Sequence, residues 1–217
     1  MNDDLKVRLA KLGTTDLSDA MDRLGVAGQV SGIMPLDKSF SLVGRAWTLR
    51  YGSVGPQGGS VGDYIDDVSS DEVIVLDNQG RMDATVWGDL LTLTASRRNV
   101  AGTVIDGVCR DIDRALTLNY PIFARGNWMR TGKDRVHVEA VNEPVTVGRV
   151  RVAPGDWLRG DGDGLVALPQ TQVEEIVATA EEIAQAEDRI RHLVERGGSL
   201  REARAANNYH LLQTRRA

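Results

Sequence analysis

The order of short apolar segments between residues 73 and 118 limits the folds open to this chain more than any other feature. Residues 73–76 and 102–105 are rich in β-branched side chains, as buried strands are, and residues 77–80, Asp-Asn-Gln-Gly, predict a turn that ends the first of them. A segment of helical character follows each of them, over residues 90–95 and 112–118. Because strands that alternate with helices build a sheet covered by those helices, the middle of the chain predicts an α/β core.

The segments on either side of this core add a helix before it and strands after it. Leu17, Ala20, Met21 and Leu24 recur at helical spacing, and Gly25 follows them as a stop signal. From residue 136 to Pro169 the chain has only short strand patterns separated by turns. The whole pattern fits neither a purely doubly wound sheet nor a purely β sandwich, so we expect mixed α/β/β layers.

After Pro169 the chain becomes amphipathic and helical. Apolar residues fall on one face of the expected helix, with acids and arginines opposite; they are Val173, Ile176, Val177, Ala180, Ile183, Ala184, Ile190 and Leu193. Glycines 197 and 198 end this helix, and Ser199 begins a second short one. We therefore divide the chain into a domain over residues 1–169 and a helical extension over residues 170–217. The extension has two candidate partners, its own core and a neighbouring subunit.

Composition and charge exclude several classes of protein. The chain has 26 basic and 31 acidic residues among 217, a net charge of −5, which does not suit a protein that binds a phosphate backbone. A single cysteine rules out an intrachain disulfide or a cysteine-built zinc site and is typical of a reducing compartment. The N-terminus lacks signal-peptide character, and no apolar run approaches membrane-spanning length. We expect a cytoplasmic protein that binds neither nucleic acid nor membranes.

Three other features have structural explanations that we favour over functional ones. The glycine-rich residues 52–60 lack the Gly-Lys-Ser/Thr ending of a phosphate-binding loop, which leaves a surface loop or the rim of a pocket. Residues 161–164, Asp-Gly-Asp-Gly, lack the ligand spacing of a calcium loop and predict a tight turn. Cys109 has none of the three histidines of the chain in a recognisable triad context, so we interpret it as an apolar core residue.

The strongest candidate for chemistry lies at two strand-to-helix junctions, residues 87–91 and 106–111. Ligands of open α/β sheets collect where strands end and helices begin, because unpaired amide groups at the positive end of a helix attract anions. These junctions carry Asp89, Arg110 and Asp111, with twenty residues between the first two. A structural alternative makes both aspartates N-caps and the arginine a solvated ion-pair partner.

Several segments along residues 14–169 resemble the RraA-like family. This family includes the regulator of ribonuclease E activity A and the class II aldolases that act on 4-hydroxy-4-methyl-2-oxoglutarate and 4-carboxy-4-hydroxy-2-oxoadipate. The matching segments are residues 16–25, 44–48, 88–91, 106–111, 121–126 and 154–156. Asp89, Arg110 and Asp111 also satisfy the aldolase signature, an Asp followed after twenty residues by Arg-Asp.

The resemblance implies a role for each residue of this constellation. Asp111 would be the direct protein ligand of Mg²⁺ or Mn²⁺, Arg110 would hold the enolate oxygen of pyruvate, and Asp89 would hold the water that takes the proton of the 4-hydroxyl. The loop at Gly88 and the backbone amides of Leu90 and Leu91 would bind the substrate carboxylate. Outer carboxylates that orient metal-bound water would fall on Asp19 and, from a neighbouring subunit, on Glu187.

The resemblance also implies a fold, an assembly and an activity. The fold would be the α/β/β/α swivelling-domain type with a C-terminal helical extension, assembled as a trimer or a dimer of trimers. The activity would be metal-dependent cleavage of a 4-hydroxy-2-oxoacid, or decarboxylation of oxaloacetate, through a pyruvate enolate. The alternative is a non-catalytic regulator that binds a ribonuclease, to which an acidic surface could dock. A methyltransferase is not expected, because no glycine-rich cofactor loop follows a first strand.

Two departures from the family pattern bear on the substrate. Asp19 is one methylene shorter than the glutamate that some aldolases use. Residues 127–129, Asn-Trp-Met, replace the small or hydroxyl residues common in relatives. Together with Trp47 and Trp87, Trp128 therefore indicates a pocket unlike that of the dicarboxylic aldolases, unless these aromatic side chains belong to the core.

Overall fold

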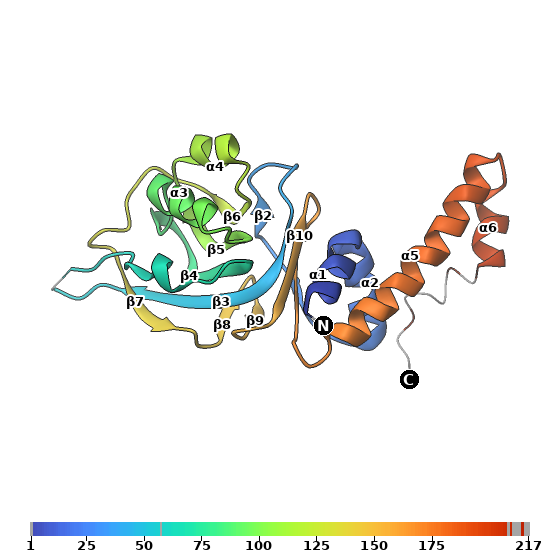
Figure 1. The fold of residues 1–217 in the computed structure, drawn as a ribbon, viewed down its shortest axis with the longest axis horizontal. Coiled ribbons are helices and arrows are strands. Elements are labelled where there is room, and N and C mark those ends of the chain that lie inside the picture. The colour runs from blue at the N-terminus through green and yellow to red at the C-terminus, as the bar shows by residue number, and fades with distance from the viewer. Residues whose placement is uncertain (1, 57, 208, 210–213, 215–217) are drawn as a thin grey trace.

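The computed structural model describes residues 2–56, 58–207, 209 and 214, and within them the chain forms a mixed α/β fold (Figure 1). The strands are β1 (Gln29–Val30), β2 (Met34–Pro35), β3 (Leu42–Ser53), β4 (Glu72–Thr85), β5 (Gly102–Cys109), β6 (Ile122–Asn127), β7 (Val136–Val141), β8 (Val145–Val147), β9 (Val150–Val152), β10 (Trp157–Asp161) and β11 (Gly164–Leu168). The helices are α1 (Asn2–Lys11), α2 (Thr14–Leu24), α3 (Asp89–Arg97), α4 (Ile112–Leu118), α5 (Val173–Glu195) and α6 (Leu200–Ala206), with a 3₁₀ turn, η1, at Tyr64–Asp67. The predicted α/β class with C-terminal helices is confirmed.

The centre of the molecule is a parallel sheet with helical crossovers. The main sheet has the order β1-β11-β10-β3-β4-β5-β6-β2, with β7 paired to β3 outside this path. Strands β3, β4, β5 and β6 are parallel to one another, and α3 and α4 connect β4 to β5 and β5 to β6. Every residue of β5 is buried, as expected for a strand covered on both faces. Both helices lie over one face of this sheet, and the β8–β9 hairpin lies on the other side (Figure 1).

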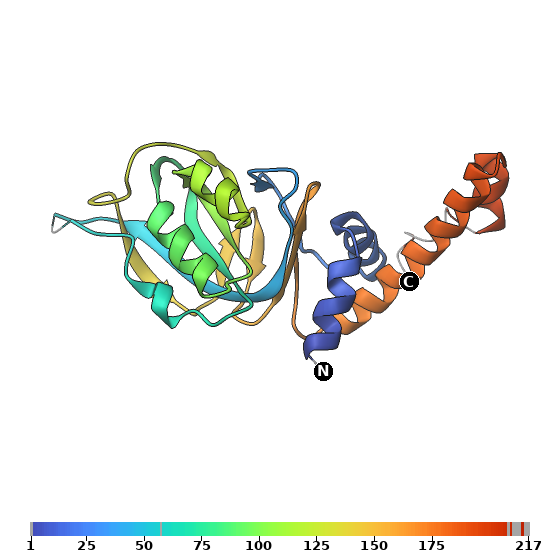
Figure 2. The same cartoon turned by 45° about the horizontal axis from the view of Figure 1, so that its top comes forward.

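A second apolar cluster joins the two ends of the chain. Helices α1, α2 and α5 pack together against the β10–β11 hairpin, and Leu9, Leu17, Met21, Leu168 and Ile176 are fully buried there. The first part of α5 thus packs on the core of its own chain. Beyond it, α5 and α6 project away from the rest of the molecule in both views (Figures 1 and 2).

The structure corrects the predicted order of helices and strands at residues 77–80 and before residue 14. Residues 77–80 were expected to form a turn that ends the first strand of the core, but β4 continues through them to Thr85. Gln79 and Gly80 adopt positive φ values of 55° and 69°, and the pairing with β5 shifts between Asp77 and Arg81. The turn residues therefore make an irregularity within a strand. The other correction is α1, which was not expected.

Other local predictions are confirmed. Helix α2 ends at Gly25, which adopts the left-handed conformation with φ 70°. Residues 161–164 form the turn between β10 and β11, in which the Asp163 amide donates to Oδ1 of Asp161 at 3.0 Å. Among the described residues, no helix combines the length and the apolar character needed to cross a membrane.

Candidate functional site

The two junctions that carry the predicted residues lie side by side at the carboxyl ends of β4 and β5. Thr85 near the end of β4 pairs with Val108 of β5. Just beyond this pair, the Arg110 amide donates to the carbonyl oxygen of Trp87 at 3.0 Å. The parallel register of the two strands, which sequence spacing alone does not fix, therefore brings Asp89, Arg110 and Asp111 to one place.

Asp111 connects the two helices that begin here. Its Oδ2 accepts the backbone N–H of Asp89 at 3.1 Å and lies 3.4 Å from Nε of Arg110. The residue adopts a left-handed conformation with φ 58°, which aspartate tolerates better than most side chains. Its carboxylate thus lies at the positive end of α3, where helix geometry favours an anion.

This arrangement corrects the structural alternative that made both aspartates ordinary N-caps. The N-cap of α3 is Gly88, and Asp89 is the first helical residue. Asp111 does occupy the N-cap position of α4, but its carboxylate makes no capping bond to that helix among the described residues. It binds the neighbouring helix instead, and this contact between helices requires the tertiary fold.

Gly88 allows the three residues to approach one another. A Cβ atom at this position would lie 2.9 Å from Oδ2 of Asp111 and 3.3 Å from Nε of Arg110. Two hydrogen bonds stabilise the backbone at Gly88. The Trp87 indole donates to Oγ1 of Thr92 at 2.8 Å, and that hydroxyl donates to the Gly88 carbonyl at 3.0 Å. Absence of a side chain at Gly88 therefore serves the packing of the charged groups.

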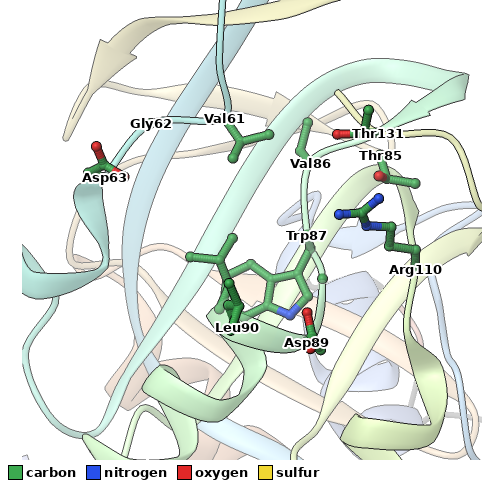
Figure 3. Close-up of a pocket in the computed structure, with 12 residues that line it drawn as sticks. Val61, Gly62, Asp63, Thr85, Val86, Trp87, Asp89, Leu90, Arg110 and Thr131 are labelled. Atoms are coloured by element: carbon green, nitrogen blue, oxygen red, sulfur yellow. The ribbon is translucent and has the colours of Figure 1, made fainter. Parts of the chain in front are cut away.

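Two pockets open at this place, and Arg110 lines both. We call the first the α3 pocket; it measures about 260 Å³. Its lining residues are Val61, Gly62, Asp63, Thr85, Val86, Trp87, Gly88, Asp89, Leu90, Leu91, Arg110 and Thr131. In Figure 3 the guanidinium of Arg110 extends into this pocket beside Thr85, and Asp89 lies at the start of the helix below it. The second, which we call the α4 pocket, measures about 610 Å³ and is lined by Arg110, Asp111, Ile112, Asp113, Asn127, Trp128 and Met129.

Some of these lining residues were not anticipated from the sequence. Residues 61–63 follow directly on the glycine-rich stretch and line the α3 pocket, whereas none of the described residues of the stretch itself, residues 52–60, lines either pocket. Thr131 reaches the site through a parallel bridge with Thr85, whose amide and hydroxyl both donate to the Arg130 carbonyl at 3.0 Å. No local pattern in the sequence signals this contact, because it joins segments more than forty residues apart.

The structure separates the aromatic residues that the sequence grouped together. Trp47 is buried and stacks on Tyr64, and Trp87 is buried and stacks on Tyr120, so both belong to the core. The interpretation of Trp47 as a pocket residue is therefore corrected. Trp87 is a core residue that also lines the α3 pocket. Trp128 differs, since it is 44% exposed and lines the α4 pocket.

Cys109 precedes Arg110 but has the character of a core residue. Its side chain is fully buried. This burial raises the pKa of the Cys109 thiol to about 12, which disfavours the nucleophilic thiolate. The prediction of an inert core cysteine is supported by this environment.

The two outer carboxylates lie together, but away from Arg110 of the same chain. Asp19 is on α2 and Glu187 on α5, whereas α3 and α4, whose residues line the two pockets, lie on the other side of β10 (Figure 1). Burial raises the pKa of Glu187, and the nearby carboxylates of Asp16 and Asp19 raise it further. The structure thus unites Asp89, Arg110 and Asp111, while Asp19 and Glu187 form a separate acidic group.

The donor atoms at the site suit a hard divalent cation that takes most of its ligands from water and substrate. Among the described residues, no three His, Cys, Asp or Glu side chains cluster in a way that could enclose a metal. The Asp111 carboxylate, however, is 40% exposed and opens onto the α4 pocket. One carboxylate with several water ligands is the habit of Mg²⁺, and it does not match a structural zinc site.

Comparison with known sequences and structures connects this geometry to one group of proteins. The family described as RraA-like, Aldolase/RraA, matches residues 14–167. A Halalkalibacterium halodurans protein named "Putative 4-hydroxy-4-methyl-2-oxoglutarate aldolase" is 33% identical over 87% of this chain and 87% of its own length. Protein DlpA of Legionella pneumophila is 36% identical over 91% of this chain, but the chain spans only 32% of the length of that protein.

Solved structures give the same result for the fold. An uncharacterized protein from Pseudomonas syringae pv. tomato superposes with a TM-score of 0.88 at 40% identity, covering 93% of this chain and 97% of that one. RraAS2 of Streptomyces coelicolor, described as an unusual member of the RNase ES inhibitor RraA protein family, superposes with a TM-score of 0.79 at 27% identity. That match covers 85% of this chain and 94% of RraAS2.

Proposed function

The chain belongs to the RraA-like family, and from this premise we propose that it is a carbon–carbon lyase that depends on a divalent metal. The proposed reaction is cleavage of a 4-hydroxy-2-oxoacid, or decarboxylation of oxaloacetate, through the enolate of pyruvate. The observation that carries the proposal is the convergence of Asp89, Arg110 and Asp111 beside two pockets. A protein that only binds another protein does not need these three side chains to converge beside a pocket.

Arg110 is proposed to stabilise the negative charge that develops on the 2-oxo oxygen. When the bond between C3 and C4 breaks, its electron pair moves toward C3 and the carbonyl, and a fixed positive charge lowers the energy of that state. A guanidinium suits this role because it does not lose its proton at physiological pH. Arg110 lines both pockets, so substrate in either one meets it.

Asp89 and the first turn of α3 are proposed to perform the other two tasks. The exposed Asp89 carboxylate would hold the water that accepts the 4-hydroxyl proton. The amides of Leu90 and Leu91 belong to the first turn of α3, where N–H groups have no partner within the helix. We assign to them, and to the loop at Gly88, the binding of the substrate carboxylate.

Asp111 is the residue proposed to hold the metal. Mg²⁺ or Mn²⁺ bound there would act as a Lewis acid that polarises the 2-oxoacid. The amide of Asp89 and the guanidinium of Arg110 both contact Oδ2 of Asp111, which fixes the orientation of the carboxylate before anything binds. The folded chain therefore orients the Asp111 carboxylate in advance, and metal binding does not have to reorient it.

Asp19 and Glu187 are proposed to complete the site from a second copy of the chain. Asp19 lies on α2 and Glu187 on α5, and both helices are separated from α3 and α4 by β10 (Figure 1). A trimer, or a pair of stacked trimers, would place these helices beside the pockets of a neighbour. In that arrangement the carboxylates would orient water around the metal.

Subunit mixing tests this assembly. Arg110→Ala and Glu187→Ala are each expected to be inactive alone, because each removes one half of a shared site. After denaturation and refolding together, mixed oligomers should regain a substantial part of wild-type pyruvate release, since some interfaces then carry both intact halves. Refolded Arg110→Ala alone is the control. A fully active Glu187→Ala variant, or mixtures without recovery, would contradict the shared site.

A regulator that binds a ribonuclease is the second candidate function. It is favoured by the likeness to RraAS2, which is described as belonging to the RNase ES inhibitor family and spans most of this chain. The two candidates differ in whether the site turns over substrate.

The deciding experiment measures pyruvate release, coupled to lactate dehydrogenase, from a panel of 4-hydroxy-2-oxoacids and from oxaloacetate. We expect turnover that is lost on treatment with EDTA and restored by Mg²⁺ or Mn²⁺. Absence of turnover across the panel with either metal, combined with tight binding to a ribonuclease, would support the regulator instead.

A further inference from the structure

We propose that the physiological substrate is a monocarboxylic 4-hydroxy-2-oxoacid whose substituent on C4 is uncharged and apolar, and that Trp128 selects it. The inference rests on the proposed lyase function and concerns only the part of the substrate that leaves as a carbonyl compound. Three observations carry it: the charges that line the pockets, the position of Trp128, and the sizes of the pockets.

Within the described part of one chain, the charged side chains that line the pockets leave no partner for a second carboxylate, and the residues proposed to enter from a second copy, Asp19 and Glu187, are carboxylates as well. Among the described residues that line the two pockets, Arg110 is the single cation. Acidic side chains line both: Asp63 and Asp89 in the α3 pocket, and Asp111 and Asp113 in the α4 pocket. Since the 2-oxoacid end engages both Arg110 and the proposed metal, a carboxylate on C4 would lie among like charges, and such juxtaposition disfavours binding.

Trp128 supplies an apolar surface at the same place. Its backbone N–H donates to the Cys109 carbonyl at 2.8 Å, directly after the pairing of Cys109 with Asn127, so its position next to Arg110 is fixed by the sheet. The side chain is nevertheless 44% exposed, and the neighbouring Met129 is 70% exposed. Both line the α4 pocket together with Ile112. A large aromatic side chain at a pocket wall is a typical contact for an apolar ligand group.

The pocket sizes assign the two halves of the substrate. The α3 pocket of about 260 Å³ contains Leu90 and Leu91, whose amides are proposed to bind the carboxylate, and it suits a fragment as small as pyruvate. The α4 pocket of about 610 Å³ lies on the other side of Arg110 and has room for a larger group. The substituent on C4 therefore lies against Trp128 and Met129.

The reaction that follows is a balanced aldol cleavage. The 4-hydroxyl loses its proton to the water held by Asp89, the C3–C4 bond breaks, and its electron pair forms the enolate of pyruvate. C4 becomes the carbonyl carbon of an aldehyde that carries the apolar group. Protonation of the enolate at C3 by solvent then gives pyruvate, without an oxidant or reductant.

A matched pair of substrates tests the proposal. 4-Hydroxy-2-oxo-4-phenylbutanoate and 4-hydroxy-2-oxoglutarate differ only in whether phenyl or carboxylate is attached to C4. We expect kcat/KM for pyruvate release from the wild-type protein to be at least tenfold higher for the phenyl compound. Trp128→Ala should lower that ratio at least tenfold, Trp128→Phe should restore most of it, and Trp128→Arg should reverse the preference. Leu116→Ala, which removes an equally exposed side chain outside both pockets, should leave the ratio unchanged.

Other outcomes would overturn the proposal. A wild-type preference for the dicarboxylate would do so. An equal loss of kcat/KM for both substrates in Trp128→Ala, together with a change in sedimentation, would also do so, because it would assign Trp128 to a subunit interface. Exchange of the methyl protons of pyruvate in D₂O separates this failure from failure of the lyase function, because exchange needs enolate formation but no C4 group. A wild-type protein that cleaves neither substrate and does not exchange would refute both.

Discussion

Arg110→Ala is expected to lower kcat for oxaloacetate decarboxylation and for aldol cleavage by about 100- to 1,000-fold, the usual effect of removing one donor that stabilises a developing oxyanion. The side chain is 41% exposed, so its loss leaves no large cavity. The backbone N–H of residue 110 keeps its bond to the Trp87 carbonyl, and the local fold should therefore persist. Pyruvate release by the purified variant, with circular dichroism and thermal unfolding measured in parallel, gives the result.

Arg114→Ala is the matched control for this variant. Arg114 is an exposed arginine on α4, one turn away from Arg110, and it lines neither pocket. Loss of its charge changes the net charge of the protein equally but should leave turnover near the wild-type rate. If Arg110→Ala turned over at a similar rate to Arg114→Ala, electrostatic stabilisation by Arg110 would be refuted and the lyase proposal would lose its main support.

Asp111→Asn is expected to weaken Mn²⁺ binding by more than about 100-fold, because loss of even an outer partner of a metal ligand costs 10- to 100-fold in affinity. An asparagine side-chain oxygen can still accept the Asp89 amide, so the contact between the two helices is kept. The variant separates the charge of the carboxylate from its structural role. Titration of the protein with Mn²⁺ by electron paramagnetic resonance measures the affinity directly and independently of activity.

Asp113→Asn is the corresponding control, since Asp113 also lines the α4 pocket and is exposed. It should bind Mn²⁺ within a few-fold of the wild-type affinity. Equal weakening in both variants would mean that the pocket attracts cations only through its overall negative charge. Unaltered binding in Asp111→Asn would place the metal elsewhere and contradict the assigned ligand.

The fold could be predicted from the sequence where local patterns agree with tertiary packing. The strand and helix segments of the core, the stop at Gly25 and the Asp161 turn are all found in the structure. The prediction was wrong at residues 77–80, because turn residues that would end an isolated strand are accommodated when β5 continues the pairing beyond them. The exposed or buried state of the tryptophans likewise depends on contacts from distant segments.

The candidate site was predicted only in part for the same reason. Spacing and resemblance identified Asp89, Arg110 and Asp111, which the structure brings together. They did not indicate that the Asp111 carboxylate contacts α3 rather than α4, nor that Thr131 lines the α3 pocket. Those contacts depend on strand register, and no pattern within a single segment encodes it.

The sequence by itself determined the chemical groups that this protein can use: two carboxylates and a guanidinium at strand-to-helix junctions, an acidic overall charge, and a single cysteine with no histidine in a recognisable triad context. The tertiary structure decided how these groups face one another. It placed one cation between two pockets whose other charges are negative, and it left one tryptophan exposed at a pocket wall while it buried the other three. The physical reason is that charge and hydrogen-bonding capacity belong to single residues, whereas distance, burial and the sharing of a pocket arise only when strands distant in sequence pair.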